Sequence, residues 1–124
     1  MRILVVEDDP QVARLISLVL QRNGHQSDVV ADGGSALEKA LANSPDIIFA
    51  DLTIKGMGGE QLCSVLKSTP ETKGIPYVVV SGDRDIAEKA RLCGADDYMG
   101  KPFEFEDLIR LVNKYARAES RKAD

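Results

Sequence analysis

Carboxylates, a hydroxyl and an ammonium group each follow a short apolar run of this sequence. Glu7 and Asp8 follow ILVV, Asp51 ends DIIFAD, Ser81 follows YVVV and Lys101 follows DDYMG. Carboxylates packed together cannot all remain ionised unless a positive charge compensates them. Oxygen ligands without a nearby Cys or His favour a hard divalent cation over zinc. The sequence therefore predicts a site for Mg²⁺ or Mn²⁺ if the fold brings these side chains together.

A metal ion beside a lone aspartate, with a serine and a lysine close by, indicates phosphoryl transfer. Asp51 is the expected nucleophile, because a carboxylate can form an aspartyl phosphate. Lys101 would bind one phosphoryl oxygen, and the Ser81 hydroxyl would donate a hydrogen bond to another. The sequence has no GxxxxGK[ST] loop and no GxGxxG turn, so a bound nucleotide is not the expected donor. The GMGG stretch after Asp51 is interpreted as a flexible approach loop and a helix start.

Alternating apolar runs and amphipathic segments must position these side chains. Strands are predicted near residues 3–6, 27–30, 46–50, 77–80 and 96–99. These runs lack apolar/polar alternation, which is typical of strands covered on both faces. Five amphipathic segments separate or follow them, so the sequence predicts an α/β fold with a doubly wound, mainly parallel sheet. In such sheets ligands bind beyond the carboxyl ends of the strands, which places the candidate residues at one edge.

Helix boundaries are also marked in the sequence. Asp9 is expected to cap the first helix, with Pro10 in its first turn and Asn23-Gly24 at its end. Asp9 is therefore treated as a cap and not as a metal ligand. Cys63 and Cys93 have no CxxC spacing and are expected to be small buried helix residues. The single histidine, His25, is expected to lie at the surface in a turn.

Size and charge limit the possible functions. The chain has 124 residues with 44% hydrophobic and 29% charged residues, which suits one globular domain. A net charge of -4 and the lack of a basic run argue against direct nucleic-acid binding. The apolar runs are too short for a membrane span or a signal peptide. We therefore expect a cytoplasmic protein with no membrane partner.

In these motifs the chain resembles the receiver domain of two-component response regulators, from Arg2 to about Tyr115. The matching residues are the acidic pair Glu7-Asp8 in LVVEDD, Asp51 in DIIFADL, Ser81 in VVVSG, Lys101 in KPF and Tyr98 three residues before that lysine. Each motif alone is weak, whereas the ordered set with this spacing is specific.

The resemblance implies a flavodoxin-like, five-stranded parallel sheet of order 2-1-3-4-5 with five surrounding helices. It implies phosphorylation of Asp51 by a phosphohistidine on a histidine kinase or a histidine phosphotransfer protein. It also implies Mg²⁺ held by Asp8, Asp51 and the backbone carbonyl of Thr53, with Glu7 acting largely through water. The Lys101-Pro102 peptide bond would be cis. The protein would be a signalling phosphoacceptor that catalyses only its own phosphorylation and dephosphorylation, and otherwise no enzyme.

A switch follows from the resemblance. Ser81 would move toward the phosphoryl group and Tyr98 would turn inward to fill the vacated space. This would reshape the face made by the helix around 86–90, the strand around 96–99 and the helix around 108–115, which would contact a downstream protein. Thr53 and Asp83 are expected to flank the path of the hydrolytic water and to set the lifetime of the phosphate.

Domain organisation and three alternatives remain open from sequence alone. Residues 1–118 are predicted to form the receiver domain and residues 119–124 a polar tail. The chain could be a single-domain regulator of the chemotaxis or phosphorelay type, or part of a longer regulator with a DNA-binding or enzymatic output domain. A haloacid-dehalogenase-like phosphatase fits Asp51-Leu52-Thr53 as DxT, although in that family the nucleophile follows the first strand. A flavodoxin-like flavin protein is disfavoured because EDD would repel the FMN phosphate.

Overall fold

Five strands and five helices alternate along the chain. The computed structural model describes the backbone of residues 1–123 and the side chains of residues 1–117. The elements are β1 (Arg2–Val6), α1 (Pro10–Arg22), β2 (Gln26–Val30), α2 (Gly33–Asn43), β3 (Ile47–Asp51), α3 (Gly59–Ser68), β4 (Tyr77–Ser81), α4 (Ile86–Cys93), β5 (Asp97–Gly100) and α5 (Phe105–Ala123). All neighbouring strands are parallel and their order is β2-β1-β3-β4-β5. The predicted fold class and strand order are confirmed.

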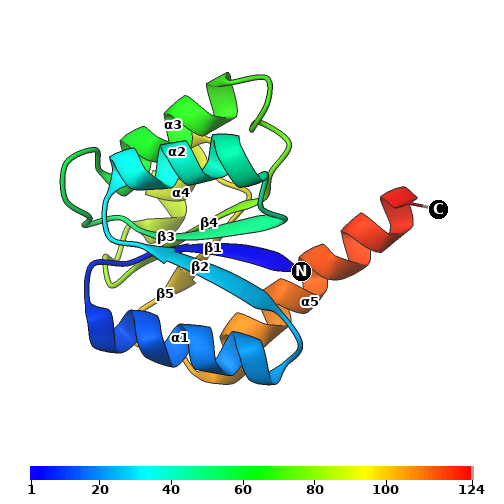
Figure 1. The fold of residues 1–124 in the computed structure, drawn as a ribbon. Helices are drawn as coiled ribbons and strands as arrows, with labels where there is room; N and C mark the ends of the chain where they lie inside the picture. The colour runs from blue at the N-terminus through cyan, green and yellow to red at the C-terminus, as the bar shows by residue number, and fades with distance from the viewer. Residues whose placement is uncertain (124) are drawn as a thin grey trace.

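The helices cover both faces of the sheet (Figure 1). α1 and α5 lie on one face, and α2, α3 and α4 lie on the other. Successive residues of a strand point to opposite faces, so each strand supplies both cores. In β1, Ile3 and Val5 pack toward α1 and α5, whereas Leu4 and Val6 belong to the cluster under α2, α3 and α4. Burial on both faces explains why the strand sequences show no polar alternation.

The predicted boundaries of α1 are confirmed. The Asp9 carboxylate accepts hydrogen bonds from the backbone N–H groups of Gln11 at 2.9 Å and Val12 at 3.3 Å. Pro10 is the first helical residue and Asn23 is the C-cap, followed by Gly24 in the left-handed region at φ 84°. These contacts pair N–H groups that have no partner inside the helix.

The last helix is longer than the sequence pattern indicated. α5 runs to Ala123, and Figure 1 shows its C-terminal part projecting beyond the sheet. Its backbone therefore passes the boundary expected at residue 118 between domain and tail, and that boundary stays a prediction. None of the helices described is both long and apolar enough for a membrane span.

The two cysteines and the histidine lie away from the carboxyl edge of the sheet. Cys63 on α3 and Cys93 on α4 are buried and free, as predicted, and the Cys63 thiol donates to the Cys93 carbonyl at 3.3 Å. His25 is half-buried, with its Nδ1 atom 3.1 Å from the terminal nitrogen of Met1. Burial and the nearby amine lower the pKa of His25. His25 directly follows the turn at Asn23-Gly24 and is only partly exposed, because the chain terminus, distant in sequence, packs against it.

Candidate functional site

The parallel register brings the predicted polar residues to one edge of the sheet. Asp51 pairs in register with Val80, and Ser81 pairs with Gly100. Glu7 follows the last residue of β1, and Lys101 follows the last residue of β5. Since parallel strands all end at the same edge, four separate strands deliver their terminal side chains to one place.

Lys101 contacts two of the carboxyl groups at this edge. Its ammonium Nζ lies 2.5 Å from Oδ2 of Asp51 and 3.5 Å from Oε1 of Glu7. Both acidic residues are buried, with exposed fractions of 7% for Asp51 and 5% for Glu7. The sequence argument assigned the compensation of these carboxylates to a metal ion. In the structure Lys101 also supplies a positive charge beside these carboxylates, and the metal ion stays a prediction.

The second oxygen of Asp51 is held by Thr53. The backbone N–H and the hydroxyl of Thr53 donate to Oδ1 of Asp51 at 3.0 Å and 3.1 Å. Sequence reasoning gave Thr53 a backbone-carbonyl role and an effect on phosphate lifetime, but it missed the hydrogen bond from its hydroxyl to Asp51. A Thr two residues after an Asp at a strand end is a recognisable signal, because short polar side chains readily bond to neighbouring backbone and side-chain groups.

The two carboxyl groups differ in their affinity for protons. Burial raises the pKa of Glu7 to about 7, and its hydrogen bond with Asp51 adds to the rise. Burial would also raise the pKa of Asp51, but hydrogen bonds from Lys101 and from the Thr53 N–H outweigh burial and lower it overall. A shared proton therefore resides on Glu7, and Asp51 stays an ionised carboxylate, the form that a nucleophile requires.

Ser81 is buried beside this group and is already hydrogen-bonded. Its Oγ atom accepts the backbone N–H of Asp83 at 3.0 Å, and its carbonyl accepts the N–H of Lys101 at 2.8 Å. The carboxylate of Asp83 turns toward α4, where it lies 2.8 Å from Nζ of Lys89. Asp83, in the β4–α4 connection, thus contacts both the Ser81 hydroxyl and a lysine of α4.

The remaining predicted residues lie around this group. Tyr98 on β5 is 46% exposed, so its ring is outside the core. The Lys101-Pro102 peptide bond is cis, as the resemblance implies. Asp8 is exposed next to the buried Glu7.

The donor atoms suit a hard cation, but they are not assembled as a metal cage. Within the described residues, no three or more His, Cys, Asp or Glu side chains are arranged to hold a metal ion. The physical reason is visible at Asp51, whose two oxygens already bind Lys101 and Thr53. Asp8, Asp51 and the Thr53 carbonyl supply only oxygen atoms, which is the ligand type of Mg²⁺ and Mn²⁺. The residue types fit such an ion, and its coordination stays a prediction.

Glycines after Asp51 allow close packing and do not act only as a flexible loop. A Cβ atom on Gly59 would collide with the carbonyl oxygen of Asp51 and with Cα of Leu52. Gly59 therefore lets the start of α3 approach the end of β3, and its carbonyl accepts the buried Tyr77 hydroxyl at 2.9 Å. The predicted helix start in GMGG is confirmed, because α3 begins at Gly59, whereas the description of a flexible loop does not fit this last glycine, which packs against the site.

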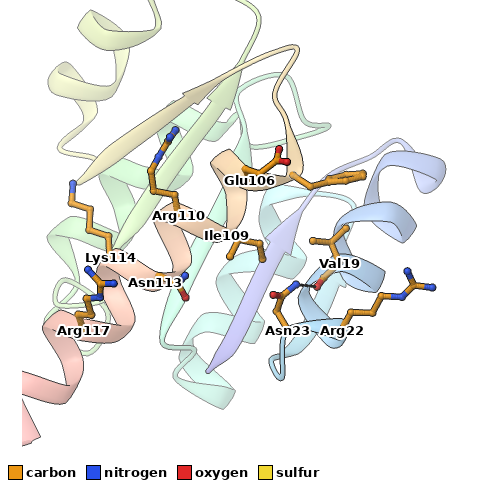
Figure 2. Close-up of a pocket in the computed structure, with 10 residues that line it drawn as sticks. Val19, Arg22, Asn23, Glu106, Ile109, Arg110, Asn113, Lys114 and Arg117 are labelled. Atoms are coloured by element: carbon orange, nitrogen blue, oxygen red, sulfur yellow. Dashed lines mark hydrogen bonds between the residues drawn. The ribbon is translucent and has the colours of Figure 1, made fainter.

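A groove on the α1/α5 face is separate from these residues. It has a volume of about 960 Å³, and Figure 2 shows Val19 of α1 and its C-cap Asn23 on one side with Ile109 and Asn113 of α5 on the other. The predicted site residues do not line it. The candidate site at the ends of the strands is therefore separate from this groove.

Comparisons with known proteins agree with this geometry. The model of the response regulator receiver domain matches residues 3–113. The chain belongs to this family. The match favours the receiver over the phosphatase and flavodoxin-like alternatives.

Among characterised relatives, the response regulator ArlR of Staphylococcus saprophyticus is 33% identical over 123 residues, which are 98% of this chain and 54% of ArlR. The DNA-binding response regulator MtrA of Mycolicibacterium smegmatis is 36% identical over 118 residues, 94% of this chain and 50% of MtrA. The receiver chain therefore spans about half the length of these two relatives.

Solved structures show the same fold. The signal receiver domain of a signal transduction histidine kinase from Syntrophus aciditrophicus has a TM-score of 0.88 and 30% identity, covering 94% of this chain and 90% of that one. The receiver domain of a sensor histidine kinase from Pseudomonas aeruginosa has a TM-score of 0.85 and 25% identity, covering 92% and 95%. That structure is described with a magnesium ion coordinated in the active-site cleft.

Proposed function

We propose that this receiver domain is a phosphoacceptor switch in two-component signalling. A histidine kinase or a histidine phosphotransfer protein would donate the phosphoryl group from a phosphohistidine. The P–N bond breaks, an O–P bond forms to a carboxylate oxygen of Asp51, and the imidazole leaves. The observation that carries this proposal is the ionised Asp51 carboxylate held at the sheet edge by Lys101 and Thr53.

Magnesium or manganese is the proposed cofactor. Asp8, Asp51 and the backbone carbonyl of Thr53 would hold the ion, with Glu7 acting largely through water. When bound, such an ion neutralises charge between an incoming phosphoryl group and the carboxylates. Lys101 already contacts Asp51, so its ammonium is placed to bind a phosphoryl oxygen once the aspartate is modified.

Ser81 and Tyr98 are the proposed switch residues. The Ser81 hydroxyl would leave its hydrogen bond with the Asp83 N–H and donate to the phosphoryl group. Tyr98, now exposed, would turn inward, and the α4–β5–α5 face would change its contacts with a downstream protein. Such a partner could be a separate protein or an output domain, since one relative is named as DNA-binding. We propose a cytoplasmic location, with neither nucleic acid nor membrane as a direct partner of this domain.

The central test is phosphorylation by a small donor. The protein is incubated with acetyl phosphate and Mg²⁺, and its intact mass is measured beside Asp51→Asn and Asp9→Asn variants. The Asp9→Asn variant is a matched control, because Asn caps a helix as well as Asp does. We expect one base-labile phosphate adduct in the parent protein and in Asp9→Asn, and none in Asp51→Asn. An unmodified parent protein with acetyl phosphate and with phosphoramidate would refute the phosphoacceptor function.

Thr53 and Asp83 are proposed to set the lifetime of the phosphate. Thr53 bonds directly to Asp51, and Asp83 bonds to Ser81, so both stand next to the group to be hydrolysed. Dephosphorylation is followed by intact mass after removal of the donor in Thr53→Ala and Asp83→Asn. Both variants should lose phosphate at a rate different from that of the parent. Unchanged rates would exclude this role.

A further inference from the structure

Lys89 on α4 connects a helix of the signalling face to the phosphorylation edge. Its Nζ atom lies 2.8 Å from Oδ2 of Asp83 and 3.8 Å from Oδ1 of Asp85. Only the first contact is short enough for a direct charged hydrogen bond. The Lys89 and Asp83 side chains are 31% and 44% exposed, so the ion pair is accessible to solvent.

Asp83 transmits this contact to Ser81. Its backbone N–H donates to the Ser81 hydroxyl oxygen at 3.0 Å, and its carbonyl accepts the N–H of Ile86 at 3.3 Å at the start of α4. Ser81 is only 4% exposed, so its hydroxyl has few other partners. An ion pair that fixes the Asp83 side chain on α4 therefore also restricts the backbone N–H that holds the Ser81 hydroxyl.

The Lys89–Asp83 ion pair also changes the net charge near Asp51. Lys89 lowers the pKa of Asp83 through its hydrogen bond and charge, while the charge of Asp51 acts in the opposite direction. Strands β3 and β4 are neighbours and Asp51 pairs in register with Val80, so the connection that starts after Ser81 carries Asp83 on the Asp51 side of this edge. A phosphoryl group on Asp51 would add negative charge to this region, and Lys89 is the cation that neutralises Asp83 there.

We propose that Lys89 is a positioning residue for the phosphorylation site, acting through Asp83 to hold the Ser81 hydroxyl and to neutralise a carboxylate beside Asp51. The kinetic part of this proposal rests on the proposed function. The positional part concerns the protein before any phosphorylation. It means that a side chain of α4 influences the reacting group through Asp83 and Ser81.

The first test measures position without phosphorylation. Solvent exchange of the Asp83 amide is measured by NMR in the parent protein, Lys89→Gln, Lys89→Arg and Arg91→Gln. Arg91 is the matched control because it forms an exposed ion pair with Glu88 on the same helix and does not contact the β4–α4 connection. We expect Lys89→Gln to speed Asp83 exchange about two- to fivefold, the range typical of an exposed ion pair. Lys89→Arg should restore slow exchange and Arg91→Gln should change nothing.

The second test measures how the charge of Asp83 affects the rate of phosphorylation. Initial rates of phosphorylation by acetyl phosphate with Mg²⁺ are compared for Lys89→Gln, Asp83→Asn and the double variant. We expect Lys89→Gln alone to be about two- to fivefold slower, because it leaves the Asp83 carboxylate uncompensated. The double variant should react like Asp83→Asn, since no carboxylate remains to repel the donor. If instead it is as slow as Lys89→Gln, the effect does not pass through Asp83 and the electrostatic part is wrong.

The positional role of Lys89 and the phosphoacceptor function can be refuted independently of each other. Equal Asp83 exchange in Lys89→Gln and Arg91→Gln would overturn the positional role even if Asp51 is phosphorylated normally. Faster exchange in Lys89→Gln, combined with an unmodified parent protein, would support the positional role and refute the phosphoacceptor function.

Discussion

Two lysines bind carboxylates at opposite edges of the sheet, and their surroundings differ. Lys67, at the end of α3, lies near the amino ends of β4 and β5. Its Nζ atom donates to the carbonyls of Ile75 at 2.8 Å and Lys73 at 3.3 Å, and to Oδ2 of Asp96 at 2.6 Å. The same Asp96 oxygen accepts the Tyr77 N–H at 2.8 Å. This lysine uses its three donors on fixed partners, and it joins a helix, a loop and two strands.

Within the described residues, the ammonium of Lys101 at the carboxyl edge contacts two carboxylates and no backbone carbonyl. It contacts Asp51 directly and Glu7 at a longer distance, and the proton affinity of Glu7 is raised as a result of burial and crowding. A single ammonium faces both carboxyl groups, so the pair favours a proton on Glu7 and a negative charge on Asp51. The two lysines therefore differ in their partners: Lys67 has a separate acceptor for each donor, whereas Lys101 is shared by two buried carboxyl groups.

The largest expected effect is on the reaction at the carboxyl edge. Lys101→Met should slow phosphorylation by acetyl phosphate about 100-fold, the loss typical of removing a group that stabilises developing charge. Its free energy of unfolding should fall by no more than about 1 kcal/mol, because Asp51 can take up a proton when the ammonium is gone. Initial rates by intact mass and urea unfolding check both expectations. If Lys101→Met lost as much unfolding free energy as Lys67→Met, the two lysines would not differ in their contribution to stability.

The corresponding change at the amino edge should affect stability alone. Lys67→Met leaves the Ile75 carbonyl and Asp96 without their charged donor, which should cost about 2 kcal/mol of unfolding free energy. Lys73→Met is the control, since that exposed side chain should change stability by no more than about 0.5 kcal/mol. Phosphorylation by acetyl phosphate should be unchanged in both variants at a temperature where they are folded. A slower reaction in Lys67→Met would contradict a purely structural role.

The pH dependence of stability tests the effect of burying the Glu7 carboxyl group beside Asp51. Its pKa is about 7 in the folded protein against an ordinary value of 4.5, so the folded state holds a proton that the unfolded state has lost between these values. Stability from this group is therefore present below pH 4.5 and lost as pH rises through 7. Glu7→Gln, which resembles the protonated acid, should stabilise the protein by about 1–2 kcal/mol at high pH in the presence of a chelator.

The same variant should have almost no effect in acid. Urea unfolding at both pH values measures the difference, and Glu38→Gln on the exposed part of α2 serves as control. An equal gain at both pH values would mean that the effect comes from packing and not from proton uptake.

The smallest expected effect concerns the cation itself. At ten times its dissociation constant, Mg²⁺ should raise the unfolding free energy by about 1 kcal/mol through mass action. Asp8→Asn should lose this increment, whereas Asp9→Asn should keep it because Asp9 bonds to the start of α1. Thermal unfolding with and without a chelator provides the measurement. A retained increment in Asp8→Asn would remove Asp8 from the proposed ligands.

Much of the fold could be predicted because its determinants are local. Continuous apolar runs indicated strands covered on both faces, and these became β1, β3 and β4 with nearly every residue buried. Asp9, Pro10 and Gly24 marked the ends of α1 through bonds between residues a few positions apart. The strand order came from the family resemblance, because alternation alone does not determine which strand lies at the centre.

The composition of the candidate site was predictable, but its contacts were not. The residue types at the strand ends indicated phosphoryl chemistry, and the parallel sheet placed them together. The sequence could not show that Lys101 already compensates Asp51 or that the Thr53 hydroxyl holds it, since these depend on side-chain geometry. Gly59 against Asp51 and the Lys89–Asp83 pair were missed for the same reason.

The sequence by itself determined the alternating elements, the caps and the set of reactive groups, because each depends on neighbouring residues or on periodicity. Tertiary structure alone decided how charge is distributed among those groups. Lys101 meets Asp51 across 50 positions and Glu7 across 94, and Lys67 meets Asp96 across 29. Electrostatic compensation depends on distances of a few ångströms between such remote residues and on the solvent that packing excludes, and no local pattern encodes either quantity.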